Sequence, residues 1–317
     1  MSFRSRLRPL KHALAPAVEF TWRSAFTVAG WVRPARARSW ASTGGTQVLI
    51  VAPHPDDEVI GCSGTALRHF MAADRVSIAI ATDGRRSGAI PQPDLMAAKR
   101  AEEAASAARL LHAELCWIGL REGEWAIPEL VGKLGALISQ RRPEIVYAPS
   151  RVDFHPEHRK VAHSLALALQ GLPATHRPST IRVYQIQVPL TAILVNLVSD
   201  LESVRAESEA ALRAHASQTG SVECTYRRRR YSARLHRMPG GIEEFWELGV
   251  ERYIELHLEP PAQWTDAYRG IRNFPLTDPL AWLIGAGHRR ELRRRVASTQ
   301  DSAVFRYRFN ANGSSRT

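Results

Sequence analysis

From Gln47 onward the sequence alternates short apolar runs with longer amphipathic stretches. The apolar runs have the length and the β-branched content of strands that are buried on both faces, and they cover residues 47–52, 75–82, 114–118 and 144–149. Helical stretches separate these runs at residues 58–72, 95–111 and 128–141. Strands that alternate with helices form right-handed crossovers in a parallel sheet. The sequence therefore predicts an α/β fold with a mostly parallel sheet and helices on both faces.

The pattern continues beyond residue 150 and then changes. It predicts a further strand at residues 181–188 and a helix at 201–216. After about residue 218 we expect an arginine-rich loop, a helix at 242–248 and a basic, partly disordered tail. The predicted organisation is a basic N-terminal segment (1–46), an α/β domain (47–260) and a basic C-terminal extension (261–317).

The net charge of +12 comes from 43 Lys and Arg residues against 31 Asp and Glu residues. The arginines are spread through the chain, whereas a nucleic-acid-binding protein clusters them with aromatic residues on one face. We therefore expect no nucleic-acid partner. The three cysteines are widely separated, which excludes a disulfide framework and favours a cytoplasmic protein.

Residues 1–46 contain arginines and tryptophans but a single acidic residue, Glu19. Pro9 and Pro16 weaken a basic amphipathic helix whose apolar stripe comprises Phe3, Leu7, Leu10, Leu14 and Val18. Lys11 and His12 interrupt the apolar run that a secretory signal requires, and no stretch is long enough to span a bilayer. Two interpretations remain: peripheral contact with an anionic membrane, or a flexible leader or strap packed on the domain.

Polar residues follow the first and the fourth predicted strands. His54, Asp56 and Asp57 follow the first, and His155 and His158 follow the fourth. Ligands of such sheets bind at the carboxyl ends of the strands, so these two loops are expected to converge. A catalytic zinc needs three nitrogen or oxygen ligands and an open position for water. His54 and Asp57 can supply two ligands from one turn, and His158 can supply the third.

The two remaining side chains fit the other steps of an amide hydrolysis. Asp56 can take the proton of the attacking water. His155 can stabilise the oxyanion or donate a proton to the leaving amine.

These motifs resemble the LmbE/PIG-L family of zinc-dependent deacetylases. Residues 53–58 (PHPDDE) match the family's first hallmark, and residues 155–158 (HPEH) match its second signature, His-Pro-Asp-His. Weaker similarities lie at residues 82–84, at Arg100 with Glu103, and at residues 217–218. The resemblance implies a Rossmann-like fold, one Zn²⁺ per chain, and removal of an acetyl group from an N-acetylglucosamine-type conjugate, either a small molecule or a glycolipid.

Matched by position, the resemblance implies zinc ligation by His54, Asp57 and His158. It places the general base at Asp56 and the histidine that stabilises the transition state at His155.

The expected substrate contacts are Arg100, Glu122 and Thr82. Arg100 matches a substrate-binding arginine of the mycothiol-pathway branch, and Glu122 stands where that branch has an aspartate. A second departure from the family is Glu157, which replaces the aspartate of His-Pro-Asp-His. We expect neither departure to touch the metal chemistry. The glutamate at position 122 leaves open which sugar the site contacts, and therefore which substrate it takes.

Other interpretations fit parts of the pattern. Residues 53–58 also suit a loop that leads into an acidic helix N-terminus, and Arg100 could pair with Glu102 or Glu103 on a solvated helix face. A dinucleotide-binding protein would carry G-x-G-x-x-G after the first strand, and this motif is missing. An inactive family member that binds sugars or membrane surfaces, or another small amide hydrolase, are the remaining alternatives.

Overall fold

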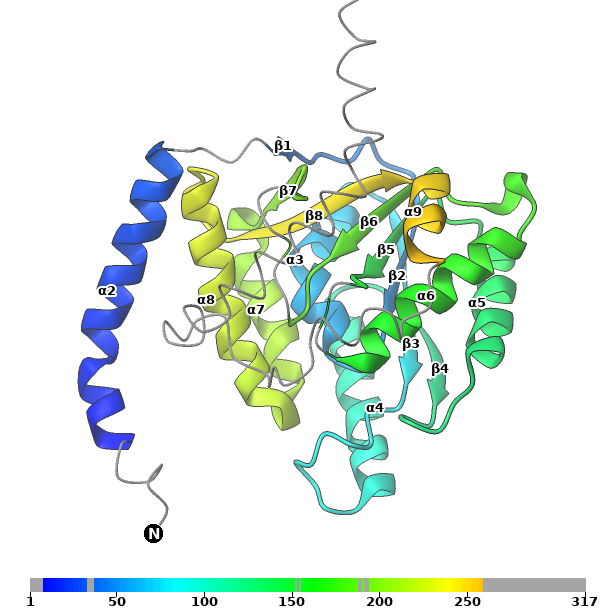
Figure 1. Cartoon of the computed structure of the whole chain (residues 1–317), viewed down its shortest axis with the longest axis horizontal. Helices are drawn as coiled ribbons and strands as arrows, with labels where there is room; N and C mark the ends of the chain where they lie inside the picture. Colours follow the sequence, from blue (N-terminus) through cyan, green and yellow to red (C-terminus); the bar gives the residue numbers. More distant parts are fainter. Residues whose placement is uncertain are drawn as a thin grey trace, which may run out of the picture.

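The computed structural model describes residues 8–32, 37–151, 153, 155–187, 190 and 194–258, and the predicted extension at 261–317 lies outside them. An eight-stranded sheet with the order β1-β7-β8-β6-β5-β2-β3-β4 forms the centre (Figure 1). Only β8 runs antiparallel to its neighbours among the described strands. The strands are β1 (Arg38–Ser39), β2 (Gln47–Ala52), β3 (Arg75–Thr82), β4 (Glu114–Leu120), β5 (Ile145–Pro149), β6 (Thr180–Tyr184), β7 (Leu197–Asp200) and β8 (Ile242–Gly249).

Helices cover both faces of this sheet (Figure 1). One layer consists of α5 (Ile127–Arg141), α6 (Pro156–Gly171) and α9 (Val250–His257). The opposite layer consists of α3 (Asp57–Met71), α4 (Pro93–Leu110) and α7 (Arg205–Ala214). Beside α7 lies α8 (Thr219–Leu235), and α2 (Arg8–Val32) runs along α8. The predicted α/β fold with a mostly parallel, doubly covered sheet is confirmed.

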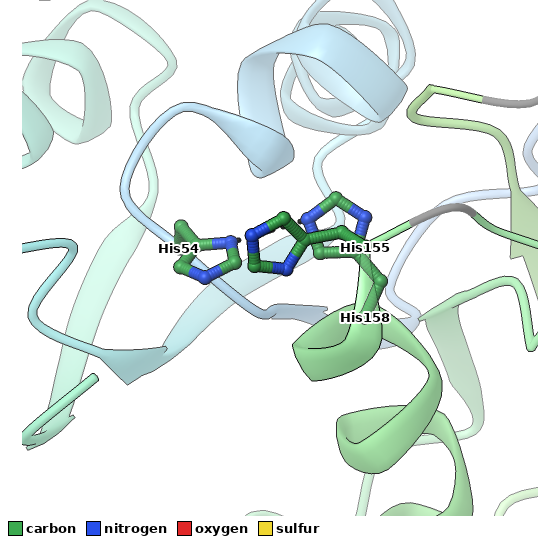
Figure 2. A group of neighbouring side chains, drawn as sticks. All are labelled: His54, His155 and His158. Atoms are coloured by element: carbon green, nitrogen blue, oxygen red, sulfur yellow. Dashed lines mark hydrogen bonds between the residues drawn. The ribbon is translucent and has the colours of Figure 1, made fainter. Parts of the chain in front are cut away.

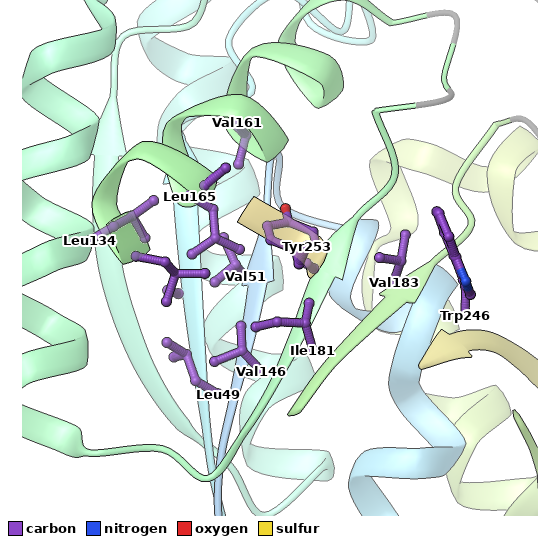
Figure 3. Close-up of a cluster of buried hydrophobic side chains, with 14 of the residues drawn as sticks. Leu49, Val51, Leu134, Val146, Val161, Leu165, Ile181, Val183, Trp246 and Tyr253 are labelled. Carbon is purple, nitrogen blue, oxygen red and sulfur yellow. The ribbon is translucent and has the colours of Figure 1, made fainter. Parts of the chain in front are cut away.

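The alternation of side chains along each strand divides the hydrophobic core into two clusters. Leu49 and Val51 of β2 contribute to the cluster beneath α5 and α6, which Figure 3 shows. Val48 and Ile50 point to the other face and pack beneath α3 and α4. Full burial of each such side chain contributes about 1.5–3 kcal/mol, so both layers hold the central strands firmly.

The strand order reverses between β2 and β5. From β2 the chain continues outward to β3 and β4, whereas from β5 it continues in the opposite direction to β6. The loops that leave β2 and β5 therefore diverge. Open α/β sheets bind ligands between such loops, at the carboxyl ends of the strands, and we call this position the crevice. Both predicted site motifs lie in these loops.

Two predictions for the region after residue 218 are wrong. The expected arginine-rich loop is helix α8, and the expected helix at 242–248 is strand β8. Consecutive acidic residues suggested a helix with a solvated face, but Glu243 and Glu244 are both buried. Glu243 accepts hydrogen bonds from Thr65 of α3, and Glu244 accepts one from Ser232 of α8. These hydrogen bonds from α3 and α8 stabilise the two buried carboxylates of β8.

The N-terminal helix α2 continues through Pro16 and packs on α8 as a strap. Tyr231 donates a hydrogen bond to Glu19, and Phe26 stacks on Tyr231 with ring centroids 5.0 Å apart. Of the expected apolar stripe, only Val18 has a described side chain, and it is 37% exposed. Among the described residues, no helix has the length and apolar character needed to cross a membrane.

Candidate active site

Two loops at the crevice carry the site, and each leads directly into a helix. Residues 53–56 connect β2 to α3, whose first residue is Asp57. The second loop ends at His155, which caps α6, and Pro156 occupies the first turn, where its missing N–H costs no hydrogen bond. Because the polar side chains sit at rigid helix starts, the crevice holds them in fixed positions.

Three potential metal-ligand atoms form a nearly equilateral triangle. His54 Nδ1 lies 3.1 Å from His158 Nε2 and 3.2 Å from Asp57 Oδ2, and His158 Nε2 lies 3.3 Å from Asp57 Oδ2. A tetrahedral zinc ion with bonds of about 2.0–2.1 Å requires its ligand atoms to lie about 3.3 Å apart. The three atoms therefore fit one face of a zinc coordination tetrahedron, which leaves the fourth position for water.

The charges around the triangle favour a cation. Burial opposes ionisation of Asp57, but the neighbouring His158 and His54 hold the pKa of Asp57 well below its usual value. Burial also opposes protonation of His158, yet Asp57 and Asp153 raise the pKa of His158 to about 10. The carboxylates thus stabilise positive charge at a buried position between two imidazoles, which is the electrostatic requirement for a metal site.

In both His54 and His158, a carboxylate lies close to the ring nitrogen that faces away from the triangle. Asp153 Oδ1 lies 3.0 Å from His158 Nδ1, and Glu157 Oε2 lies 3.3 Å from His54 Nε2. Such carboxylates fix the tautomer and the ring orientation of metal-binding histidines. Glu122 Oε1 lies 3.6 Å from His54 Nε2 as well. Both carboxylates therefore lie next to a candidate ligand, and the expectation that Glu122 and Glu157 leave the metal chemistry untouched stays a prediction.

Asp56 has an unusual backbone and a firmly held side chain. Its φ of 124° lies in a region that non-glycine residues rarely adopt, and its N–H donates to Glu58 Oε2 at 2.9 Å. Arg100 Nη2 donates to Asp56 Oδ1 at 2.7 Å. Burial raises the pKa of Asp56 to about 6 although Arg100 opposes this shift. The strained turn thus holds one carboxylate next to the triangle.

Arg100 and Thr82 lie in the wall of the crevice. Arg100 is 4% exposed and also donates to the carbonyl of Gly84 at 3.3 Å, so its alternative placement on a solvated helix face is wrong. Thr82 is buried and donates to the carbonyl of Pro53 at 2.8 Å, which braces the first loop. Substrate contacts of Arg100, Thr82 and Glu122 remain predictions.

His155 stands beside the triangle (Figure 2). Its ring meets that of His54 edge-on, with centroids 4.7 Å apart. Its Nδ1 accepts a hydrogen bond from Glu157 N at 3.3 Å, which leaves the proton on Nε2. Burial and the nearby His158 lower the pKa of His155 to about 3. His155 is therefore a neutral imidazole whose Nε2–H has no acceptor among the residues that the structure describes.

Two further groups in the described part of the chain bring potential ligand atoms within 4.8 Å of one another. One comprises the three imidazoles of His54, His155 and His158, and the other combines His54 with Glu122 and Glu157. All predicted metal, base and transition-state residues therefore meet in one crevice, but more than one triplet of them can hold an ion.

The sequence did not reveal three supporting residues. Asp153 lies two residues before His155, so its place in a loop rich in polar residues could have indicated a role at the site. Glu58 completes the first motif, but its partner His215, at 2.9 Å, comes from the end of α7, 157 residues later. No local spacing predicts such a pair.

Comparisons with known proteins find relatives of the part of the chain that carries this site. The family model described as PIG-L, GlcNAc-PI de-N-acetylase, matches residues 49–169. No curated protein matches the sequence significantly. Among solved structures, the N,N'-diacetylchitobiose deacetylase of Pyrococcus horikoshii has 23% identity and a TM-score of 0.56, over 66% of this chain and 85% of that chain.

Two further structures share the fold. The conserved protein TT1542 of Thermus thermophilus has 27% identity and a TM-score of 0.56, over 63% of this chain and 93% of that chain. GalB, the 4-carboxy-2-hydroxymuconate hydratase of Pseudomonas putida, has 18% identity and a TM-score of 0.58, over 64% of this chain and 96% of that chain. Since a hydratase shares this fold, the activity has to be argued from the site.

Proposed function

We propose that this chain, a deacetylase-like protein of the PIG-L/LmbE family, is a zinc-dependent hydrolase that removes the acetyl group from an N-acetylglucosamine-type conjugate. The observation that carries the proposal is the triangle of His54 Nδ1, Asp57 Oδ2 and His158 Nε2. These three atoms are the proposed zinc ligands. A bound zinc ion would polarise the acetamide carbonyl and make a water molecule nucleophilic at neutral pH.

Asp56 is the proposed general base. It takes a proton from the water as the water oxygen forms its bond to the carbonyl carbon. The same carboxyl group then returns the proton to the nitrogen as the C–N bond breaks, which yields acetate and the free amine. Arg100 holds the carboxylate in position through its hydrogen bond to Oδ1.

His155 is the proposed donor to the oxyanion. Its Nδ1 is occupied by the backbone N–H of Glu157, so the Nε2–H is available. A donor of this kind stabilises the negative charge that develops on the carbonyl oxygen and contributes about 3 kcal/mol to catalysis. The backbone N–H of Glu157, at the start of α6, fixes this tautomer, so the tautomer does not depend on pH.

The proposed substrate class rests on the family match and on one of the structural neighbours. The family description names an N-acetylglucosaminyl lipid, and the Pyrococcus structure is a chitobiose deacetylase. Both substrates carry an acetamide on a glucosamine ring. Glu122 accepts a hydrogen bond from Arg86 N at 2.8 Å, and its carboxylate is the proposed partner of sugar hydroxyls.

A membrane-surface contact through residues 1–46 is part of the proposal, because it would bring the crevice to lipid-linked sugars. Helix α2 exposes two large aromatic side chains, Phe20 (71% exposed) and Trp31 (73% exposed). Exposed aromatic residues on a basic helix favour the interface of an anionic membrane. We place the protein in the cytoplasm, where its three free cysteines remain reduced.

An amine-release assay over a panel of N-acetylglucosaminides tests the activity. The panel contains free N-acetylglucosamine, N,N'-diacetylchitobiose and an N-acetylglucosaminyl phospholipid. The wild type should release amine and acetate in equal amounts from at least one member, and a chelator should abolish the release. If zinc-loaded protein binds these sugars without turnover, the chain is an inactive sugar-binding member, and the proposed function is wrong.

A further inference from the structure

A second cavity lies away from the crevice, between α7 and α8. Its volume is about 680 Å³, and the turn at residues 238–241 that precedes β8 closes one end. Its walls contain five arginines and one carboxylate, that of Glu209. No residue of the candidate active site lines this cavity.

Two helical stripes build the walls. Arg205, Glu209 and Arg213 follow one another at intervals of four residues on α7, and Tyr226, Arg230 and Arg234 do so on α8. Residues four apart share one face of a helix. The sequence thus directs two rows of long side chains toward the same space.

The positive charge in this cavity is only partly balanced. Arg213 lies 3.6 Å from Glu209, and the buried Arg229 pairs with Glu243. Arg234 donates to the neutral hydroxyl of Thr27, on α2, at 3.0 Å.

Arg205 and Arg230 are exposed. Neither makes a hydrogen bond or an ion pair with any residue that the structure describes. Three guanidinium groups, those of Arg205, Arg230 and Arg234, therefore face the cavity without a carboxylate partner in the described part of the chain.

The walls are rigid. Arg229 donates to Ser208 Oγ at 2.9 Å and to the carbonyl of Val59 at 2.9 Å, which joins α8 to α7 and α3. Tyr226 donates its hydroxyl proton to the carbonyl of Glu209 at 2.8 Å. Arg230 and Arg234 repel one another at a spacing of four residues. A bound anion would relieve this repulsion without any rearrangement of the helices.

We propose that the cavity between α7 and α8 binds a phosphoryl group. Guanidinium groups bind phosphate oxygens through paired, charge-assisted hydrogen bonds. Three of them line the cavity from two helices, and a tetrahedral phosphoryl group offers them more oxygens than a carboxylate does. The phosphoryl group can belong to a soluble ester or to a lipid headgroup, and the neighbouring α2 exposes Phe20 and Trp31. This site does not depend on the proposed hydrolysis.

The test compares the full chain with Arg205→Gln/Arg230→Gln. Both arginines are exposed, so the substitutions should not affect folding. The control is Arg75→Gln/Arg109→Gln, which removes the same charge at two exposed positions outside the cavity. Binding of inorganic phosphate and glycerol 3-phosphate is measured by calorimetry at constant ionic strength. Binding to phosphatidylcholine vesicles with and without phosphatidylglycerol is measured by co-sedimentation.

We expect the cavity variant to bind at least tenfold more weakly than the wild type and the control. If glycerol 3-phosphate shows this difference, the site takes soluble phosphoryl esters. If only phosphatidylglycerol vesicles show it, the site takes lipid headgroups. Equal weakening in the cavity variant and the control would mean that net charge alone acts, and this result, like the absence of any phosphoryl binding to the wild type, would overturn the proposal.

Discussion

His54 Nδ1 lies 3.1 Å from His158 Nε2, although 104 residues separate the two histidines. Two imidazole nitrogens at this distance need a proton or a metal ion near the line that joins them, because their lone pairs otherwise repel. Asp57 Oδ2 approaches both nitrogens to within 3.3 Å and adds negative charge. β2 and β5 are neighbouring parallel strands, so the loops that follow them begin side by side at one edge of the sheet.

The first prediction separates the proposed triangle from the set of three imidazoles as the metal ligands. Asp57→Ala and His158→Ala should lose the bound zinc, because each removes one atom of the proposed triangle. His155→Ala should retain about one zinc per chain, since its ring is assigned to the transition state. Zinc per chain is measured by mass spectrometry after dialysis. Loss of zinc from His155→Ala together with full zinc in Asp57→Ala would instead assign the metal to the three imidazoles.

The second prediction concerns proton transfer by Asp56. Asp56→Asn preserves the shape of the side chain and its hydrogen bond with Arg100, but the amide cannot take a proton. Turnover should fall by about a hundredfold or more while the zinc content stays at the wild-type level. Steady-state amine release and metal analysis of the same preparation provide the measurement. An Asp56→Asn enzyme with wild-type turnover would remove Asp56 from the mechanism.

The sequence predicted the parallel half of the fold well. The bounds of β2 and β3 agree with the expected runs at 47–52 and 75–82, because buried parallel strands are continuous apolar segments. The antiparallel strand β8 was missed, since its buried acidic residues accept hydrogen bonds from partners on α3 and α8 that no local pattern indicates.

The candidate site shows the same division between local and distant information. Both histidine motifs were visible as short segments, and the rule for strand ends predicted that they meet. The contacts from Glu157 to His54 and from His215 to Glu58 were not predicted, because each joins side chains about a hundred or more positions apart. Sequence motifs thus identified the candidate reacting groups, whereas the side chains that contact them required the fold.

The third prediction tests Glu157 as the residue that orients His54. If Nδ1 binds the metal, Nε2 carries the proton and needs an acceptor, which the Glu157 carboxylate supplies at 3.3 Å. In Glu157→Gln an amide N–H could face this proton, so zinc affinity should fall by about 10–100-fold. Competition with a chelator gives the affinity. Glu124→Gln, an exposed substitution outside the crevice, should keep the wild-type affinity, and unchanged affinity in both variants would contradict the role of Glu157.

The fourth prediction links stability to pH through His257, the last residue of α9. Its Nδ1 donates to the carbonyl of Tyr253 at 2.8 Å, and its ring stacks on Tyr253. Burial, assisted by Arg151, lowers the pKa of His257 to about 3. As the pH falls below about 6.5, the His257 side chain is protonated in the unfolded chain before it is protonated in the folded protein. The stability that the neutral His257 contributes at pH 7 is therefore lost progressively down to about pH 3.

His257→Phe keeps the stacked ring and removes this titration. Between pH 7 and pH 4 the wild type should lose about 3 kcal/mol more of its free energy of unfolding than the variant does. Urea unfolding at several pH values measures the difference. The exposed His112 offers a control, His112→Asn, which should follow the wild-type pH dependence. Parallel pH profiles of the wild type and His257→Phe would show that His257 does not contribute.

The last prediction asks whether α2 binds membranes. Removal of all residues before Thr46 is unsuitable as a test, because it would delete β1, which pairs with β7, and the buried Trp40. Phe20→Ser/Trp31→Ser leaves this framework in place and removes the two exposed aromatic side chains of α2. Co-sedimentation with anionic vesicles should weaken several-fold in this variant. The matched control is Phe70→Ser/Trp117→Ser, which changes one phenylalanine and one tryptophan that are partly exposed elsewhere.

The electrostatic part of this binding should depend on salt. Raising the ionic strength from 0.1 M to 1 M shortens the Debye length from about 10 Å to about 3 Å, so attraction to anionic lipid should largely disappear. The control variant should bind as the wild type does at each salt concentration, and neutral vesicles should bind weakly throughout. If Phe20→Ser/Trp31→Ser binds anionic vesicles as tightly as the control, α2 serves as a strap on α8 and the substrate reaches the crevice without help from the helix.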